Sequence, residues 1–150
     1  MDAQSKKVLS FYEILKCMLG KTVNIICINP QTAFQGILSK LNYTHLVLQT
    51  ADREIAIYPR NIASVMIVNN VDELVTIEKT MFQNENSDYY KYLNKFVFCL
   101  SNKTRWGHSG ILTYIGSNYV TIFNEEDCEY FRVPINDIRY MATSLTDLVV

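Results

Sequence analysis

The chain contains one short pattern twice, and this repeat constrains the fold more than any other feature of the sequence. Gly36-Ile37-Leu38-Ser39 recurs seventy-four positions later as Gly110-Ile111-Leu112-Thr113. Each stretch is followed at matched spacing by an apolar run, Leu46-Val47-Leu48 in the first copy and Val120-Thr121-Ile122 in the second. The sequence therefore predicts two related structural units in tandem.

The correspondence continues after a two-residue insertion in the second copy. Ile55-Ala56-Ile57 then matches Phe131-Arg132-Val133, and Asn61-Ile62 matches Asp137-Ile138. Within each copy, short β-rich runs alternate between apolar and polar residues and are separated by turns, which is typical of an antiparallel meander. We predict strands at about 22–29, 34–41, 45–50, 54–58 and 62–67, and again at about 95–101, 109–115, 118–123, 129–134 and 137–141.

Five short strands cannot cover both faces of a flat sheet, so each copy is expected to curl into a small five-stranded barrel. Gly36 and Gly110 fall where the second strand of each copy would bend. The predicted fold class is thus mainly β, with two tandem barrels and a short α-helix before each one.

Three helical stretches accompany the strands. Ser10 and Glu13 form a capping-box pattern at the start of a helix from Phe11 to Leu19, and Gly20 ends it. A second helix is predicted at 71–82 and a third at 88–93. We place a first unit at 1–68, a helical linker at 69–86 and a second unit at 87–150.

The charge of the chain is nearly balanced but unevenly distributed. Fourteen Lys and Arg residues face fifteen Asp and Glu residues, for a formal charge of −1. Residues 1–68 hold seven basic and four acidic residues, which gives +3, while residues 69–150 hold seven and eleven, which gives −4. Without an overall basic excess, the chain lacks the composition expected of a protein that holds nucleic acid mainly through phosphates.

Motifs for catalysis, metal binding or membrane insertion are missing from the sequence. The four Cys residues are scattered without a Cys-x-x-Cys pair, and only His45 and His108 accompany them, so we predict reduced, mostly buried thiols, no metal site and no cofactor. Phosphate loops and nucleophile elbows are also absent, so we predict no catalytic residues and no small-molecule substrate. With neither an apolar secretion signal nor a membrane-length apolar run, the protein is expected to be soluble and cytoplasmic.

Part of each copy resembles a known family. A helix running into Gly20-Lys21-Thr22-Val23, then Gly36-x-Leu38 and Leu46-x-Leu48, resembles the first half of an Sm-like domain. That resemblance implies a bent five-stranded barrel, and many Sm-like proteins assemble into rings and bind RNA. The Arg-Gly or Lys-Gly turn of the RNA-binding members is replaced here by Tyr58-Pro59-Arg60-Asn61 and Pro134-Ile135-Asn136-Asp137.

The end of the chain has a second resemblance. Residues 131–138 resemble the last strands of short Sm-like proteins from spore-forming bacteria, some of which are linked to the spore coat. This similarity implies a spore-associated location as an alternative to a general cytoplasmic one.

Two groups of residues are candidates for binding. The turn between the first two strands of the second copy holds two cations, the one Trp of the chain and a His, which suits a protein partner or a nucleobase. The residues are Lys103, Arg105, Trp106 and His108. The alternative for this turn is a solvated loop with Trp106 folded over the barrel mouth.

The second group lies in the turns of the first copy, where an RNA base could stack on an aromatic ring and bond to an amide. It comprises Lys40, Asn42, Tyr43, His45, Arg53, Arg60 and Asn61. Ordinary polar turn residues are the alternative interpretation. The leading hypothesis is a non-enzymatic interaction module that assembles with itself or with another protein, and the rival hypothesis is an RNA-binding Sm-like protein.

Overall fold

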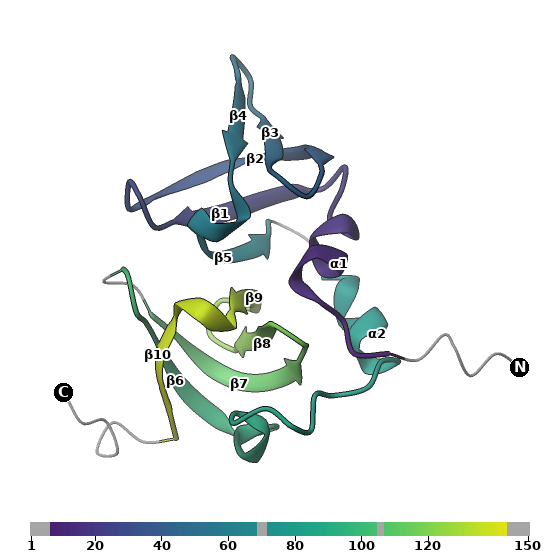
Figure 1. The fold of residues 1–150 in the computed structure, drawn as a ribbon, viewed down its shortest axis with the longest axis vertical. Helices are drawn as coiled ribbons and strands as arrows, with labels where there is room; N and C mark the ends of the chain where they lie inside the picture. The colour runs from purple at the N-terminus through teal and green to yellow at the C-terminus, as the bar shows by residue number, and fades with distance from the viewer. Residues whose placement is uncertain (1–6, 69–71, 105–106, 144–150) are drawn as a thin grey trace, which may run out of the picture.

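The computed structural model describes residues 7–68, 72–104 and 107–143, which form ten antiparallel strands in one sheet (Figure 1). The first half of the chain contributes β1 (Thr22–Cys27), β2 (Thr32–Leu41), β3 (Leu46–Gln49), β4 (Glu54–Ile57) and β5 (Ile62–Ile67). The second half contributes β6 (Phe96–Ser101), β7 (Gly107–Ile115), β8 (Tyr119–Asn124), β9 (Glu129–Pro134) and β10 (Ile138–Ala142). The fold is mainly β, and each strand lies within about two residues of its predicted range.

The sequence pattern led us to expect two separate closed barrels, and the strands do not form them. Their order is β10-β6-β7-β8-β9-β5-β1-β2-β3-β4, so β9 of the second half pairs with β5 of the first half. The ten strands therefore make one continuous sheet that is not closed. Its outer strands are β4 at one end and β10 at the other.

The pairing pattern within β1–β5 recurs within β6–β10. Val23 pairs with Gly36 in the first half, and Val97 pairs with Gly110 in the second half. An irregularity follows Leu38 in β2, and another follows its counterpart Leu112 in β7. The residue pairs between β1 and β5 recur with the same spacing between β6 and β10.

Gly36 and Gly110 are required at these positions because the neighbouring strand comes very close. A Cβ on Gly36 would lie 2.8 Å from the carbonyl oxygen of Gln49, and a Cβ on Gly110 would lie 2.1 Å from that of Phe123. Gly110 also has a φ of +155°, which side chains disfavour. Each glycine thus allows the second strand of its half to pack tightly against the third.

The N-terminal helix α1 (Phe11–Lys16) has the predicted start. Ser10 Oγ accepts from the backbone N–H of Glu13, and the Glu13 carboxylate accepts from the backbone N–H of Ser10, which completes the capping box. The helix ends three residues earlier than predicted, at Lys16, and residues 17–20 form turns that lead to Gly20 at φ +84°. One face of α1 is buried, with Phe11, Ile14 and Leu15 among its residues.

The other two predicted helices differ from the structure. The linker helix is shorter than predicted, because α2 spans Leu74–Lys79. The α-helix predicted at 88–93 is wrong: only the 3₁₀ turn η3 (Tyr90–Tyr92) forms there. The physical reason is that a few residues with two adjacent aromatics make too short a segment for the cooperative α-helical ladder.

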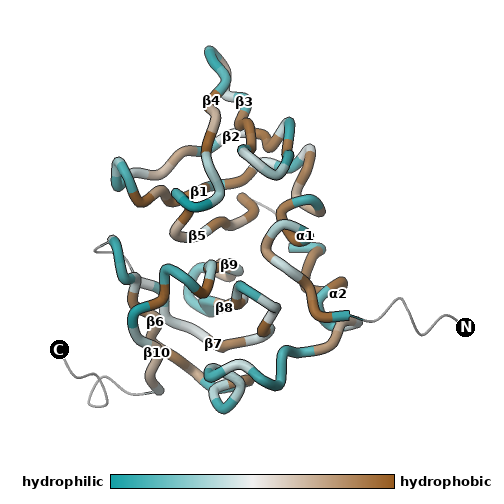
Figure 2. The backbone as a smooth tube through the Cα atoms, viewed as in Figure 1, coloured by the Kyte–Doolittle hydropathy of each residue, from teal (hydrophilic) through white to brown (hydrophobic). Residues whose placement is uncertain are grey.

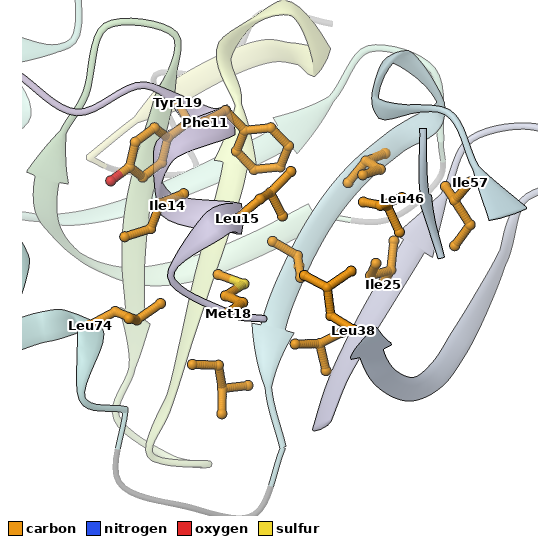
Figure 3. Close-up of a cluster of buried hydrophobic side chains, with 14 of the residues drawn as sticks. Phe11, Ile14, Leu15, Met18, Ile25, Leu38, Leu46, Ile57, Leu74 and Tyr119 are labelled. Atoms are coloured by element: carbon orange, nitrogen blue, oxygen red, sulfur yellow. The ribbon is translucent and has the colours of Figure 1, made fainter. Parts of the chain in front are cut away.

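The main core lies where α1 meets the sheet. Figure 3 shows Ile14, Leu15 and Met18 between Tyr119 on one side and Leu38 and Leu46 on the other. Because Tyr119 begins β8, this core includes side chains from both halves. A smaller core around Val97, Leu112 and Ile122 belongs to the second half alone.

Polar parts of the chain lie at the periphery. Figure 2 shows hydrophilic residues at the tip of the β3–β4 hairpin and hydrophobic residues along α1. Among the described residues, no helix is long and apolar enough to cross a membrane.

Candidate functional site

The junction between the halves is the first interaction surface that the structure defines. Val65 of β5 pairs with Arg132 of β9, and these strands lie side by side at the centre of the molecule (Figure 1). The Arg132 side chain is fully buried there. A buried guanidinium requires nearby carboxylates, because an unpaired buried charge is strongly unfavourable.

The linker supplies those carboxylates. Arg132 Nη1 donates to the carboxylate of Asp72, and Nη2 donates to Glu78 Oε1 at 3.0 Å. Glu78 lies on α2, and its Oε2 also accepts from Tyr119 Oη and Thr121 Oγ1, each at 2.7 Å. The network therefore fixes the linker helix against the strands of the second half, next to the junction.

The electrostatics of this network favour the charged form of Arg132 and the protonated form of Tyr119. Burial alone would favour the neutral form of Arg132, but attraction to Glu78 and Asp72 outweighs it and raises the pKa of Arg132. Burial and the Glu78 charge raise the pKa of Tyr119, which stays a hydrogen-bond donor. In this structural clamp, a charged Arg132 and the Tyr119 hydroxyl both bond to carboxylates of the linker.

The same junction contains a direct contact between side chains of the two halves. His108 Nε2 lies 3.0 Å from Ser64 Oγ, and the His108 ring stacks on Phe131 with centroids 4.1 Å apart. Burial lowers the pKa of His108 to about 4, so the ring is neutral at pH 7. His108, predicted as part of a partner-binding turn, thus lies on β7 and packs within the chain's own junction.

A small cavity adjoins this contact and is lined by Asp137 and Cys99. Its volume is about 10 Å³, which is room for about one water molecule. Asp137 Oδ2 accepts from Ser101 Oγ at 2.7 Å, whereas Oδ1 has no hydrogen-bond partner among the described residues. Burial raises the pKa of Asp137, and burial with the nearby Asp137 charge raises that of Cys99 to about 12. Although a Ser, a His and an Asp come together, this cavity is too small for an organic substrate.

The N-terminal segment forms a third link between the halves. The backbone N–H of Leu9 donates to Tyr114 Oη at 3.0 Å, and that of Phe11 donates to Asn118 Oδ1 at 2.7 Å. Ser117 N–H in turn donates to the carbonyl of Leu9 at 2.8 Å. The first half is therefore held to the β7–β8 turn as well as to β9.

The free edges β4 and β10 form the second candidate surface. Among the described strands, neither has a neighbour on its outer side. Ala56 and Tyr58 are exposed at the β4 edge, and Arg139 is exposed on β10. Phe96 and Leu100 on β6, beside β10, are also exposed. Backbone groups on an unpaired edge are a template for another strand.

The seven residues predicted to bind RNA are dispersed over several turns. Lys40 lies near the end of β2, Asn42, Tyr43 and His45 in the β2–β3 turn, Arg53 in the β3–β4 turn, and Arg60 and Asn61 in the 3₁₀ turn η2 (Pro59–Asn61). Asn42 Oδ1 accepts from the backbone N–H groups of Thr44 and His45, which makes it a turn-forming residue. Asn61 bonds through both ends of its amide to the backbone of Asn29.

Tyr43 and Arg60 are exposed members of this set that contact aromatic rings, and Lys40 and Arg53 are exposed as well. Tyr43 is 87% exposed and stacks on Tyr12 with ring centroids 4.6 Å apart. Arg60 lies over the Tyr58 ring at 5.7 Å. Because Tyr43 and Arg60 line different hollows of the surface, the structure does not bring them into one site.

A cleft between the halves places Arg60 close to a residue of the other predicted set. It has a volume of about 240 Å³ and is lined by Arg60 and Lys103 together with Asn118 and Asn136. Neither cation forms a salt bridge with a described carboxylate. Arg105 and Trp106, predicted with Lys103 as a partner-binding turn, lie outside the described residues.

The described parts of the chain contain no group of three or more His, Cys, Asp or Glu arranged to hold a metal ion. Of the four Cys residues, which we predicted to be mostly buried, Cys27 and Cys99 are buried, Cys17 is partly buried and Cys128 is exposed.

The sequence analysis missed the junction residues, although the repeat contained a signal for them. Arg132 interrupts an apolar strand at the place where the first copy has Ala56. Asp72 and Glu78 in the linker are acidic residues on a predicted helix and could have been considered as its partners. Comparisons with protein-family models, with curated proteins and with solved structures found no match.

Proposed function

We propose that this chain is a non-enzymatic assembly module that associates with protein partners by adding strands at its free sheet edges. The observation that carries the proposal is the β5–β9 junction, where the chain joins its own halves edge to edge. Strand addition supplies backbone hydrogen bonds for affinity, while side chains at the edge supply specificity. The outer strands β4 and β10 offer the same kind of edge.

Two further features support self-association. The first half carries +3 and the second half −4, so opposite ends of two molecules attract each other. The recurring strand registers support a duplication of one five-stranded unit, and the proposed unit resembles an Sm-like barrel. Two such units joined through β5 and β9 would leave a fourth strand, β4, at one edge of the sheet and a fifth strand, β10, at the other.

The test measures the mass of the purified full-length chain by size exclusion with light scattering over a wide concentration range. We expect a mass that rises above the monomer with increasing concentration. Ala56→Lys should shift the assembly toward monomer, because a Lys on an edge strand opposes pairing with another chain. Gln35→Lys is the matched control, since Gln35 is also exposed but lies on the inner strand β2.

A chain that stays monomeric at every concentration would contradict self-association. Equal loss of assembly in both Lys variants would also count against the edge, because it would indicate a general effect of added charge. Circular dichroism of both variants checks that the fold is retained.

RNA binding is the second candidate function, and the cleft with Arg60 and Lys103 is the observation that favours it. Arg60 and Lys103, which form no salt bridge with a described carboxylate, lie beside two Asn side chains and suit a phosphate and a base edge. Asp137 also lines the cleft and attracts Lys103. The test is titration with single-stranded RNA at several salt concentrations. Arg60→Ala with Lys103→Ala should weaken binding and flatten the salt dependence, whereas salt-independent or unaltered binding would reject this site.

A further inference from the structure

The cleft between the halves is lined by the turns that follow the fourth strand of each half. The turn η2 (Pro59–Asn61) follows β4, and the turn η4 (Ile135–Asp137) follows β9. Arg60 from η2 and Asn136 from η4 both line the cleft, together with Lys103 from the turn between β6 and β7. A ligand in this cleft would therefore contact both halves of the chain at once.

Hydrogen bonds hold the walls of this cleft in place. Asn118 Oδ1 accepts from the backbone N–H of Phe11 at 2.7 Å, and the backbone carbonyl of Asn118 accepts from the N–H of Ile135 at 2.9 Å. On the other side, the Asn61 amide bonds to the backbone of Asn29, which fixes η2. A cleft that is already formed loses little conformational entropy when it binds a ligand.

Positive charge and hydrogen-bond donors come together in the cleft. Arg60 and Lys103 are exposed, and neither forms a salt bridge with a described carboxylate. Because Asn118 Oδ1 is occupied as an acceptor, the N–H groups of that amide are left to donate. Asn136 is exposed and offers a second side-chain amide. A guanidinium, an ammonium and amide N–H groups are the donors that bind an oxyanion.

The cleft is weakly positive overall. Asp137 also lines it and attracts Lys103. Two positive side chains, Arg60 and Lys103, and this one carboxylate give the lining residues a net charge of +1. A ligand with one negative charge balances that charge, whereas a phosphate dianion would leave an excess of negative charge.

The remaining walls of the cleft are apolar, and its volume is about 240 Å³. The apolar residues are Phe11, Ile28, Pro59, Ile62 and Pro134. Clefts that hold drug-sized ligands have volumes of about 300–1,000 Å³, so this one suits a smaller molecule. Apolar walls favour a hydrocarbon body over a ribose, because ribose hydroxyl groups would lose their hydrogen bonds to water there.

We infer that this cleft binds a small organic monocarboxylate, with its carboxylate held by Arg60 and Lys103 and its apolar body packed against the aromatic and proline side chains. This site goes beyond the proposed assembly function, because its ligand is a small molecule that lies between the halves. Since the ligand contacts residues that come together only in the folded chain, it stabilises that chain.

The experiment is a titration of the isotope-labelled full-length chain followed by nuclear magnetic resonance. The probe is isocaproate, a short branched carboxylate. We expect saturable shifts in the signals of Arg60 in the first half and of the Asn118 and Asn136 side-chain amides in the second half. Isocaproamide has the same shape without the charge and should bind at least about tenfold more weakly, because it lacks the charge-assisted hydrogen bonds.

A pair of double variants tests the assigned residues. Arg60→Gln with Lys103→Gln removes both cations and should weaken the binding of isocaproate at least about tenfold. Lys91→Gln with Lys95→Gln is the matched control, because it removes the same charge from exposed residues that do not line the cleft. The control should bind isocaproate within about twofold of the wild type, since distant surface charges are screened by salt.

No saturable shift of these signals with isocaproate would overturn the inference. Equal binding of the acid and its amide, or equal weakening in the two double variants, would overturn it as well. Single-stranded RNA that shifts the same signals when isocaproate does not would assign the cleft to nucleic acid instead. None of these results depends on the mass measured by light scattering, so the assembly function stands or falls separately.

Discussion

β4 and β9, the fourth strands of the two halves, pair with the third strand of their own half in the same way but have different surroundings. β9 lies in the middle of the sheet between β8 and β5, whereas β4 lies at the edge and, among the described strands, pairs with β3 alone. At equivalent places, β9 carries the buried Arg132 and β4 carries the exposed Ala56. Two strands of similar pattern can thus become an interior strand or an edge strand, depending on what the rest of the chain supplies.

The linker makes this difference. Asp72 and Glu78 neutralise Arg132, and they occur once in the chain, between the halves. Among the described residues of the first half, no acidic segment forms salt bridges with β4 in this way. Charge pairing around Arg132 thus distinguishes the internal junction from the outer edge, where Ala56 and Tyr58 are exposed.

The largest effect is expected from removing the charge that distinguishes β9 from β4. Arg132→Ala leaves the buried carboxylates of Asp72 and Glu78 without their positive partner and should lower the free energy of unfolding by about 3–5 kcal/mol. Ala56→Arg, the reciprocal change at the exposed place, should alter it by less than about 0.5 kcal/mol. Urea unfolding followed by circular dichroism measures both. A loss below about 1 kcal/mol for Arg132→Ala would show that the clamp does not stabilise the fold.

A second test asks whether the halves unfold together. Leu38 and Leu112 are equivalent and fully buried, but Leu38 lies in the core shared by both halves and Leu112 in the core of the second half. Each Leu→Ala change should cost about 2–5 kcal/mol and shift the same single transition, because α1 and α2 tie the halves together. Calorimetry that resolves two transitions, one moved by each variant, would instead support the predicted separate units.

A third test uses pH, since His108 in the second half corresponds to Phe34 in the first half. The folded state lowers the pKa of His108 from 6.5 to about 4, so it binds the proton more weakly than the unfolded chain. The stability from neutral His108 is therefore complete above pH 6.5 and is lost as the pH falls toward 4, by about 3 kcal/mol in all. Unfolding curves at several pH values should show this slope.

His108→Gln keeps a polar partner for Ser64 and should remove that part of the slope. The nearby Asp137 acts in the opposite direction, because burial raises its pKa and protonation relieves the cost of its buried charge. The difference between wild type and His108→Gln isolates the histidine. An unchanged slope in the variant would assign the acid sensitivity to other groups.

The smallest effect on the free energy of unfolding is expected from Ser10 and Ser87, which precede the helical turns before β1 and β6. Ser10→Ala removes a capping-box oxygen and should cost about 1 kcal/mol. Ser87→Ala should cost less, because Ser87 Oγ accepts one bond at 3.2 Å before a single 3₁₀ turn. Thermal unfolding compares the two variants. An equal or larger loss for Ser87→Ala would mean that the segment before β6 is as important as α1.

Local features of this fold could be predicted from the sequence because they depend on neighbouring residues. Alternation with a period of two placed the strands, and Ser10 with Glu13 marked the start of α1. The β5–β9 pairing could not be predicted in this way, because Val65 and Arg132 are distant in sequence and period two does not specify which edges meet.

The candidate site was harder to predict than the strands. The sequence neighbours of His108 are typical of a surface turn. Its contacts with Ser64 and Phe131 are tertiary and are seen only in the folded chain. Asn61 likewise looks like a free turn amide, but its position beside Asn29 is a tertiary contact. Residue type indicated a polar role in both cases, and the fold decided what that role was.

The bond between Leu9 and Tyr114 also has a consequence for synthesis of the protein. These residues are 105 positions apart, so α1 leaves the ribosome long before β7 and β8 exist to receive it. We expect Phe11 and Ile14 to remain partly uncovered during that interval, because Tyr119 completes their packing. Contacts of such long range form late and slow the folding of a chain. The nascent first half is therefore the stage at which a chaperone would have an apolar helix to hold.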